Sequence, residues 1–269
     1  MKKILFPLLL IACMACQKEV KKPEEEILVT IPDAFFETKL VEQKIDSEGE
    51  VNGFVKKEDA LKVDTLNVSY GGVGTWPGEI SSLAGIEAFE NLKYLDCSGQ
   101  SIEKLDLSGN LNLEVLYCGG IYAGGGGTAK QVRSIDVGEN RGLRILSFPY
   151  TYVKNIDFLK NQPELEVLNL TNSDISKLEI QKNKKLRKLY ASACFNLYGG
   201  KVRQVDLREN TKLEVVRLFA QGLTAICVAN IDFDKLIIDT VPNGDATGNW
   251  LQEETAWFKD DYTTYSLCE

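Results

Sequence analysis

The sequence contains no histidine among its 269 residues. This absence removes the usual Ser-His and Cys-His nucleophile pairs and any zinc site with histidine ligands. Beyond Cys16 no two cysteines stand in a CxxC spacing, which disfavours a structural zinc site built from paired cysteines. The formal net charge of −8 disfavours sequence-independent binding to nucleic acid. No segment after the first residues is long and apolar enough to be predicted as a membrane span.

The first residues are typical of an export signal. Lys2 and Lys3 precede the apolar stretch 4–11, which only Pro7 interrupts. A membrane span needs about 20 apolar residues, so this short stretch behind two lysines predicts a signal peptide. We therefore expect residues 1–16 to direct the protein out of the cytoplasm.

The signal ends in a lipobox-like segment that offers two cysteines for lipidation. Leu10-Ile11-Ala12 before Cys13 is the better match to a lipobox, whereas Cys16 gives a more usual signal length and precedes a charged segment. A plain cleaved signal is the alternative. A lipidated cysteine would anchor the chain to a membrane without spanning it. We expect an envelope protein at the outer membrane or cell surface, with residues 17–30 as a disordered tether.

One apolar spacing recurs between Leu92 and Val228: apolar, two residues, apolar, one residue, apolar. The first triplets are Leu92-Leu95-Cys97, Leu113-Leu116-Cys118, Leu143-Leu146-Phe148, Leu165-Leu168-Leu170, Leu186-Leu189-Ala191 and Leu213-Val216-Leu218. Each is followed by a second triplet: Ile102-Leu105-Leu107, Val132-Ile135-Val137, Val153-Ile156-Phe158, Ile175-Leu178-Ile180, Val202-Val205-Leu207 and Leu223-Ile226-Val228. An Asn closes five second triplets, at Asn110, Asn140, Asn161, Asn183 and Asn210.

The spacing predicts a repeat solenoid. Successive repeats start 21, 30, 22, 21 and 27 residues apart, which is a 21-residue unit with insertions and fits a leucine-rich repeat. One turn buries little alone, but stacked turns close a continuous core. The Asn amide should satisfy backbone groups at the bend. We expect an α/β-type solenoid of mostly short parallel strands with little helix.

Caps are expected at both ends, because the first and last turns cannot leave their core open to water. We predict a helical cap over residues 31–62, the solenoid over 63–240 and an aromatic C-terminal cap over 241–269. Asp33 is the expected N-cap of a helix. The apolar residues expected near one face of that helix are Phe35, Phe36, Leu40 and Val41.

An acidic turn follows the predicted helix. Asp46, Glu48 and Glu50 have the alternating spacing that opens a calcium loop. The expected glycine is delayed to Gly53, however, and Asp59 rather than a Glu stands near the closing position. A capping turn without metal is therefore the favoured interpretation, with calcium as the alternative.

The segment Leu92–Asn110 closely resembles the short leucine-rich repeats of Bacteroidota surface proteins, which alternate an LxxLxC half with an LxxLDLSxN half. Residues 31–36 resemble their N-terminal capping helix, 46–60 their degenerate EF-hand-like turn, and 83–89 their entry into the first repeat. The resemblance implies an exported interaction module, often a lipoprotein, without catalytic residues to transfer. The shifted acidic turn and the Gly-rich insertions depart from the family pattern, and the shift counts against metal binding.

Five cysteines follow the signal. Cys97 and Cys118 occupy the third apolar slot of consecutive turns, so we expect them to stack in the core. Cys194 stands at the head of an insertion and is also expected to be buried. An exported context permits a disulfide between Cys227 and Cys268, which would join the last turn to the C-terminal tail.

Three insertions, at 70–79, 119–131 and 193–201, follow the first triplet of their turns. Equal phase in a solenoid predicts a ridge along one rim of the concave sheet. Aromatic residues in this phase suit protein contacts or sugar stacking; the alternative is that the rings pack on each other to hold the loops. The rim candidates are Trp76, Tyr122, Tyr152, Phe195 and Tyr198.

The outward position on the concave strands supplies the other candidates. Read in order, the residues between the second and third apolar slots are Asn67, Asp96, Tyr117, Ser147, Asn169, Tyr190 and Arg217. Tyr117 and Tyr190 are the ligand-binding candidates among these outward residues. Asp106 and Asp136 are expected to stack on the opposite side because the repeat recurs, so they do not indicate catalysis.

These observations predict a monomeric, non-catalytic binding module without cofactor. We expect a protein ligand at the concave face and aromatic rim, with glycan binding as the alternative. A glycoside-active enzyme is a less favoured hypothesis, because it needs two carboxylates about 5–10 Å apart in a cleft. A purely structural envelope component is the remaining alternative.

Overall fold

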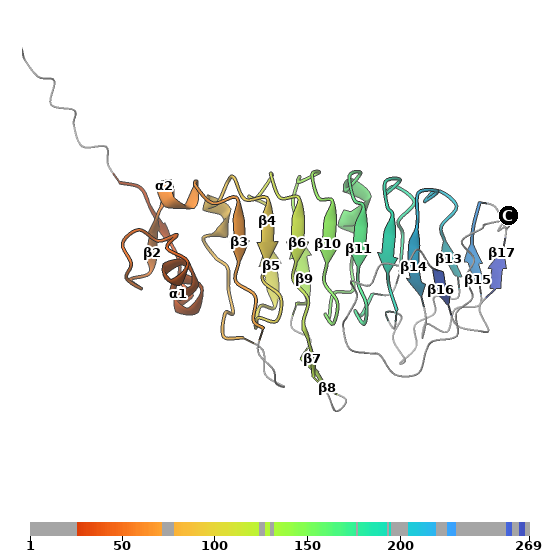
Figure 1. Cartoon of the computed structure of the whole chain (residues 1–269), viewed down its shortest axis with the longest axis horizontal. Coiled ribbons are helices and arrows are strands. Elements are labelled where there is room, and N and C mark those ends of the chain that lie inside the picture. Colours follow the sequence, from red (N-terminus) through yellow and green to blue (C-terminus); the bar gives the residue numbers. More distant parts are fainter. Residues whose placement is uncertain are drawn as a thin grey trace, which may run out of the picture.

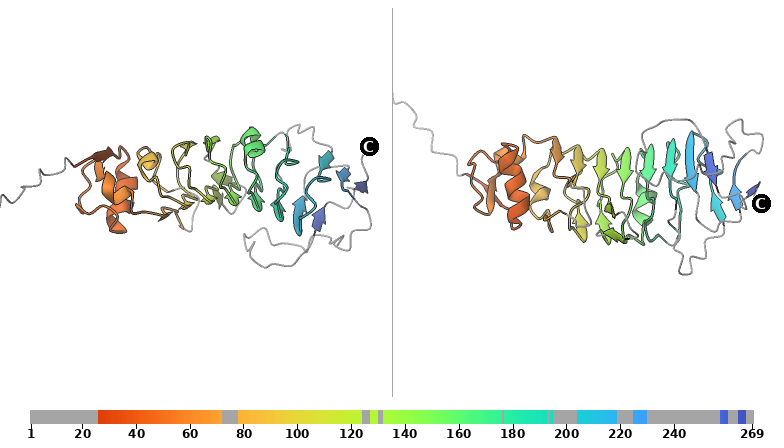
Figure 2. Two further views of the ribbon diagram at one scale, coloured as in Figure 1. Left: turned by 90° about the horizontal axis from the view of Figure 1, so that it is seen from above. Right: turned by 60° about the horizontal axis from the view of Figure 1, so that its bottom comes forward.

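The computed structural model describes residues 26–71, 78–123, 127–129, 132–175, 177–192, 194, 204–218, 225–229, 257–259 and 264–266. Figure 1 shows a long row of short strands between a helical N-terminal end and the C-terminus. Seen from above in Figure 2, successive turns stack as coils along the long axis. Each turn contributes one strand to a front sheet, and several contribute a second strand behind it.

The front sheet joins the first apolar triplets of consecutive turns. Its strands pair in parallel, and their central apolar residues share one register, as in the partners Leu95 and Leu116. In sheet order they are β3 (Thr65–Asn67), β4 (Tyr94–Asp96), β6 (Val115–Tyr117), β10 (Ile145–Ser147), β11 (Val167–Asn169), β12 (Lys188–Tyr190), β14 (Val215–Leu218) and β16 (Trp257–Lys259).

The back strands come from the second triplets and form two shorter parallel groups. One group is β5 (Lys104–Asp106) and β9 (Ser134–Asp136); the other is β13 (Gln204–Asp206), β15 (Ala225–Cys227) and β17 (Thr264–Ser266). Between these two groups, the second triplet Val153-Ile156-Phe158 overlaps the 3-10 helix η2 (Asp157–Asn161). Strands β16 and β17 lie within the predicted C-terminal cap, and they continue both rows by one further strand.

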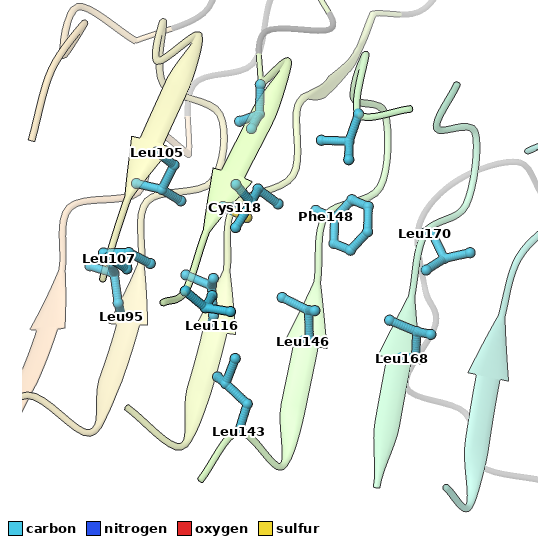
Figure 3. Close-up of a cluster of buried hydrophobic side chains, with 14 of the residues drawn as sticks. Leu95, Leu105, Leu107, Leu116, Cys118, Leu143, Leu146, Phe148, Leu168 and Leu170 are labelled. Carbon is cyan, nitrogen blue, oxygen red and sulfur yellow. The ribbon is translucent and has the colours of Figure 1, made fainter. Parts of the chain in front are cut away.

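The core fills the space between the front and back strands. Every described member of the apolar triplets is buried except Phe158, which is half-buried. Figure 3 shows Leu116, Leu146 and Leu168 in neighbouring strands, with Cys118 and Phe148 in the next slot. A fully buried leucine contributes about 1.5–3 kcal/mol relative to exposure, so each turn adds several such terms. The predicted leucine-rich-repeat solenoid is confirmed.

Buried amides connect the turns at the bend after the back strands. The side chains of Asn110, Asn140, Asn183 and Asn210 are buried. Each donates through Nδ2 to two backbone carbonyl oxygens of the preceding turn, over 2.8 to 3.2 Å. These bonds satisfy carbonyls that the turning chain would otherwise leave unpaired in the core.

The prediction that Asn161 belongs to this ladder was wrong. Asn161 is exposed at the end of η2, whereas the neighbouring Gln162 is buried and donates through Nε2 to the carbonyl oxygen of Asn140 at 2.7 Å. Gln162 stands three residues before Leu165, the same offset that separates Asn110 from Leu113. The helix η2 moves the ladder position one residue along the chain, and the longer glutamine side chain reaches the same bend.

A second ladder lies at the bend after the front sheet. Gln100, Ser173 and Cys194 are buried there. Their side chains donate to the carbonyl oxygens of Val68, Phe148 and Leu170, over 2.5, 2.9 and 2.6 Å respectively. The burial expected for Cys194 is confirmed, and its thiol takes the place of the amide or hydroxyl donor of other turns.

The N-terminal cap covers the first turn. It consists of the antiparallel strands β1 (Leu28–Thr30) and β2 (Phe54–Lys56) with the helices α1 (Ala34–Glu42) and α2 (Lys57–Ala60). Residues 28–30 were expected to belong to the disordered tether, but they pair with β2 and so belong to the cap. Within α1, Phe36 and Leu40 face the core, whereas Phe35 is exposed and does not share the buried face expected for it. Among the described residues, no helix has the length and apolar character needed to cross a membrane.

Asp33 joins the cap to the solenoid. Its Oδ1 accepts hydrogen bonds from the amides of Phe35 and Phe36, both at 3.0 Å, which confirms it as the N-cap of α1. Its Oδ2 accepts from the amides of Ser81 and Ser82 and from the Ser81 hydroxyl, over 2.8 to 3.0 Å. Burial opposes ionisation of this carboxyl, but the hydrogen bonds from Ser81, Phe36 and Ser82 outweigh it and lower the pKa of Asp33.

Close packing continues at the entry into the first repeat. Gly85 precedes the short 3-10 helix η1 (Ile86–Ala88) and has a φ of 97°, which side chains rarely adopt. A Cβ there would lie 2.5 Å from Cδ1 of Ile31 and 2.6 Å from the carbonyl oxygen of Thr30. Glycine is therefore required for the cap to pack against this turn.

Substitutions at Asp33 should separate its two functions. Asp33→Asn keeps an acceptor for α1 but loses the ionised acceptor for Ser81 and Ser82, so we expect a loss of about 1 kcal/mol; Asp33→Ala loses both and should cost about 2 kcal/mol. Because the folded pKa is lowered, the stabilisation is complete above the ordinary value of 3.8 and disappears as the pH falls through the folded pKa. Hydrogen exchange of α1 measures both effects; equal exchange in the two variants and wild type would contradict them.

The insertion at 119–131 contains a hairpin. Its strands β7 (Ile121–Ala123) and β8 (Gly127–Ala129) pair antiparallel, and Figure 1 shows them extending beyond one edge of the front sheet. The hairpin therefore starts from the edge at which the insertions were predicted to form a rim.

Candidate functional site

The outward residues of the front sheet form two parallel rows. One row was not anticipated: the residues just before the central apolar slot are half-exposed and apolar on four adjoining strands. We call Tyr94, Val115, Ile145 and Val167 the apolar row. They are direct register partners from β4 to β11, and strands lie about 4.8 Å apart, so the row runs roughly 14 Å across the sheet.

The apolar row is bounded at both ends by polar side chains. Thr65 is the partner of Tyr94 on β3, and Lys188 is the partner of Val167 on β12. The second outward row is the one predicted from the sequence, from Asn67 to Arg217. Its charges are separated: Asp96 lies near one end and Arg217 at the other, on β4 and β14.

Two tyrosines meet at the acidic end of these rows. The rings of Tyr94 and Tyr117 have centroids 5.9 Å apart at an interplanar angle of 49°. Burial, followed by the neighbouring Asp96 carboxylate, raises the pKa of both phenols. Both hydroxyl groups therefore keep their protons at neutral pH and can donate hydrogen bonds to a ligand.

A line of alternating charges flanks the apolar row on its other side. Its members are Lys93, Glu114, Arg144, Glu166, Arg187 and Glu214, which follow one another through backbone hydrogen bonds between turns. The guanidinium of Arg144 donates to Glu166 at 3.0 Å, and Arg187 donates two bonds to Glu214 at 3.0 and 2.9 Å. The bond from Arg144 outweighs desolvation and lowers the pKa of Glu166. Four of the six charges are thus paired as Arg144–Glu166 and Arg187–Glu214, and the line as a whole holds three basic and three acidic side chains, so its formal charge is balanced.

Of the sequence candidates on the sheet, Tyr117 is half-exposed and Tyr190 is only 8% exposed. The guanidinium of Arg217 lies 5.7 Å from the centroid of the Tyr190 ring. Tyr190 therefore lies on the predicted face but is largely covered, as is Ser147, so neither offers the open surface expected of its position.

Among the rim candidates, Tyr152 is half-exposed, and the Arg133 guanidinium lies 4.6 Å from its ring centroid. The backbone of Tyr122 belongs to β7, and its side chain is outside the described part of the chain. Trp76, Phe195 and Tyr198 also lie outside the described residues. The shared rim therefore stays a prediction.

Two open cavities lie on the side of the back strands. One, of about 390 Å³, is lined by residues that include Glu87, Lys104 and Asp106. The other, of about 310 Å³, includes Asp157 and Glu179. Hydrogen bonds from Ser108 lower the pKa of Asp106, and bonds from Lys177 and Lys160 lower that of Glu179. The general acid of a glycosidase needs a raised pKa, whereas the pKa values of these two carboxylates are lowered.

The acidic turn of the cap is held by its own hydrogen bonds. Asp46 Oδ1 accepts from the amide of Glu48 at 2.9 Å, and the Glu48 carboxylate accepts from Asn52 Nδ2 at 2.9 Å. Glu50 is exposed. Among the described residues, no group of three acidic or cysteine side chains is arranged to hold a metal ion.

The cysteines differ in state. Cys97 and Cys118 are free and buried in neighbouring turns, as expected. Burial is the main cause that raises the pKa of both thiols, with a smaller effect from Asp96. Cys227 is disulfide-bonded. Its pairing with Cys268 stays a prediction, because Cys268 lies outside the described residues.

The raised pKa values predict that Cys97 and Cys118 resist alkylation. At pH 8 a free thiol with its usual pKa of about 8.5 is partly ionised, whereas these two stay protonated and enclosed. Native protein treated with iodoacetamide should leave both peptides unmodified by mass spectrometry, and urea-unfolded protein should label both. Modification of either at the rate of the unfolded chain under native conditions would contradict this burial.

No family model and no curated protein matches the sequence. Among solved structures, the functional domain of InlJ from Listeria monocytogenes is similar, with a TM-score of 0.55 and 18% identity over 79% of this chain. An internalin, inlF, of the same species has a TM-score of 0.50 and 18% identity over 74% of this chain. The chain spans 42% of the first structure and 63% of the second.

The fold thus defines a leucine-rich-repeat protein, and internalins share that fold. The InlJ domain is described as including a cysteine ladder. In this chain Cys97 and Cys118 occupy the same slot of two consecutive turns, and Phe148 follows in the third. At this identity the likeness concerns the fold alone.

Proposed function

We propose that this protein is a non-catalytic binding module whose ligand is another protein, bound on the outer face of the front sheet. The observation that carries the proposal is the apolar row, from Tyr94 to Val167. Half-exposed apolar side chains in line on four strands offer area for a partner, and the line of charges beside them is balanced in sign. Tyr117 adds an aromatic contact of the kind enriched in protein interfaces.

The protein is further proposed to work outside the cytoplasm as a lipid-anchored monomer of the bacterial envelope. The signal-like residues 1–16 and the alternative lipidation sites Cys13 and Cys16 support this location. The lowered pKa values of Asp106 and Glu179 do not match the raised pKa that a glycosidase general acid requires.

A glycan is the second candidate ligand. It is favoured by one specific arrangement, the tilted Tyr94–Tyr117 pair beside Asp96, because aromatic rings and a carboxylate suit the apolar face and the hydroxyls of a sugar.

Capture experiments separate the two ligands. The immobilised chain is exposed to host and bacterial surface extracts, each divided into untreated, protease-treated and periodate-oxidised portions. We expect a ligand that protease removes and periodate leaves intact. Loss on periodate treatment alone would favour the glycan, and a ligand retained equally by a chain with Ile145→Glu would argue against the front sheet.

A further inference from the structure

We propose that the outer surface of the N-terminal cap contacts lipid and rests on the bilayer to which the chain is anchored. The inference depends on the lipid-anchored part of the proposed function. Seven large apolar side chains are exposed among the described residues, and five of them lie on the cap. We call these five the cap patch: Ile27, Leu28, Phe35, Val51 and Phe54.

The register of the cap strands places part of this patch on one face. Leu28 pairs with Lys56 and Thr30 with Phe54, and directly paired residues of an antiparallel ladder point to the same side. The alternate residues Val29 and Val55 point inward, where Val55 is fully buried. The outer face of this ribbon therefore carries Leu28 and Phe54, which are 48% and 40% exposed.

The cap holds the remaining patch residues in fixed positions. The buried carboxylate of Glu37, on α1, accepts hydrogen bonds from the amides of Asn52, Gly53 and Phe54 over 2.8 to 3.2 Å. This ties the turn that carries Val51 to the helix from which Phe35 projects. The amide of Lys57 bonds the carbonyl oxygen of Ile27 at 2.8 Å. The patch is thus preformed and needs no folding step on binding.

The position of the patch in the chain indicates what it contacts. Ile27 follows Cys16 by eleven residues, and eleven residues span at most about 36–40 Å even when fully extended. An acylated Cys16 would therefore hold the cap close to the membrane at all times, and Cys13 would add only three residues. The front sheet extends away from the cap along the solenoid, as Figure 1 shows, so a cap on the membrane leaves the apolar row accessible to a partner.

The charge of the cap indicates which lipids it prefers. Residues 26–62 contain nine acidic side chains and five lysines, a formal net charge of −4. Lys56, beside the exposed strand residues, is paired with Glu26 at 2.5 Å and lies 3.8 Å from Glu48. Anionic headgroups would be repelled by this surface, so the apolar side chains should insert among zwitterionic headgroups.

Vesicle flotation tests the proposal on the chain from Gln17 to Glu269 without an acyl group, which holds every described residue. The vesicles are phosphatidylcholine alone or phosphatidylcholine with 40% phosphatidylglycerol. We expect the wild type to float with the neutral vesicles and less with the anionic ones. Leu28→Ser with Phe54→Ser should lower the partition coefficient at least about tenfold, because insertion scales with apolar area.

The matched control is Leu111→Ser with Tyr70→Ser, which also removes two exposed apolar side chains but from the solenoid; Leu111 is 56% exposed and Tyr70 is 42% exposed. This control should float within about twofold of wild type. Circular dichroism and size-exclusion chromatography of each variant establish that it is folded. Absence of wild-type flotation, or an equal loss in both double variants, would overturn the proposal. So would a wild-type dimer that the cap variant abolishes without any vesicle binding, because the patch would then bind a second copy.

Lipidation is measured independently from the mass of the N-terminal peptide of the protein isolated from membranes. If the cysteine is acylated but the acyl-free chain does not float, the proposed lipid-contacting surface is wrong. The proposal of an anchored binding module then still stands. If the N-terminal peptide carries no lipid, the proposed lipid anchor is wrong. The reason for placing the cap on a bilayer is then lost as well.

Discussion

Replacing Gln162 with alanine should lower the free energy of unfolding by about 2–4 kcal/mol, whereas replacing the adjacent Asn161 should change it by less than about 0.5 kcal/mol. Gln162 is buried and donates to the carbonyl oxygen of Asn140 at 2.7 Å. Its removal leaves that carbonyl unpaired in the core and opens a cavity, and the two costs add. Asn161 is exposed on η2.

Urea unfolding followed by far-UV circular dichroism measures the pair under identical conditions. Asn183→Ala is the positive control, because it removes two hydrogen bonds, to the carbonyl oxygens of Leu159 and Gln162, and should cost at least as much. Contacts in a solenoid are mainly between neighbouring turns, so hydrogen exchange should show the loss first around β10 to β12. An effect of Asn161→Ala as large as that of Gln162→Ala would mean that the ladder is assigned one residue out of place.

Ile145→Glu should weaken binding of the captured partner at least about a hundredfold without unfolding the chain. Ile145 is at the centre of the apolar row, with Val115 and Val167 as its register partners. A partner that covers this row would bury the new carboxylate without a counter-charge, which is among the most costly changes at an interface. Because the side chain already points outward, the free protein loses little stability.

The matched control for this substitution is Ser134→Glu, on the back strand β9. It adds the same charge to an exposed outward position of the solenoid. Its dissociation constant, measured by titration calorimetry with the same partner, should stay within about threefold of wild type. Equal weakening by both substitutions would assign the effect to net charge, and would count against the front sheet as the site.

The fold could be predicted from the sequence because one spacing repeats and each repeat makes the same demand for burial. The apolar triplets, the amide ladder apart from its position at Gln162, and the Asp33 cap all follow from local patterns. The exchange of Asn161 for Gln162 could have been found by counting three residues back from Leu165, as the other turns allow. The contact of Asp33 with Ser81 could not, because the two residues are 48 positions apart and meet only when the cap packs on the first turn.

The candidate site was predicted in part. Tyr117 was found because it stands between two core residues of its strand, but the same alternation places Tyr94, Val115, Ile145 and Val167 outward as well. These were overlooked because apolar residues next to a leucine pattern suggest core. Two features depend on side-chain positions that no spacing specifies: the low exposure of Tyr190, and the pairing of Arg144 with Glu166 between adjacent turns.

Site-specific photo-crosslinking tests the binding face most directly. A benzoylphenylalanine is placed at Val115 on the front sheet, at Ser134 on the back strands or at Tyr152 towards the rim, and each chain is irradiated with the captured partner. We expect a covalent adduct from position 115 and none from position 134, and an adduct from 152 would extend the site to the rim. Adducts from 134 or 152 without one from 115 would contradict the front sheet as the binding surface.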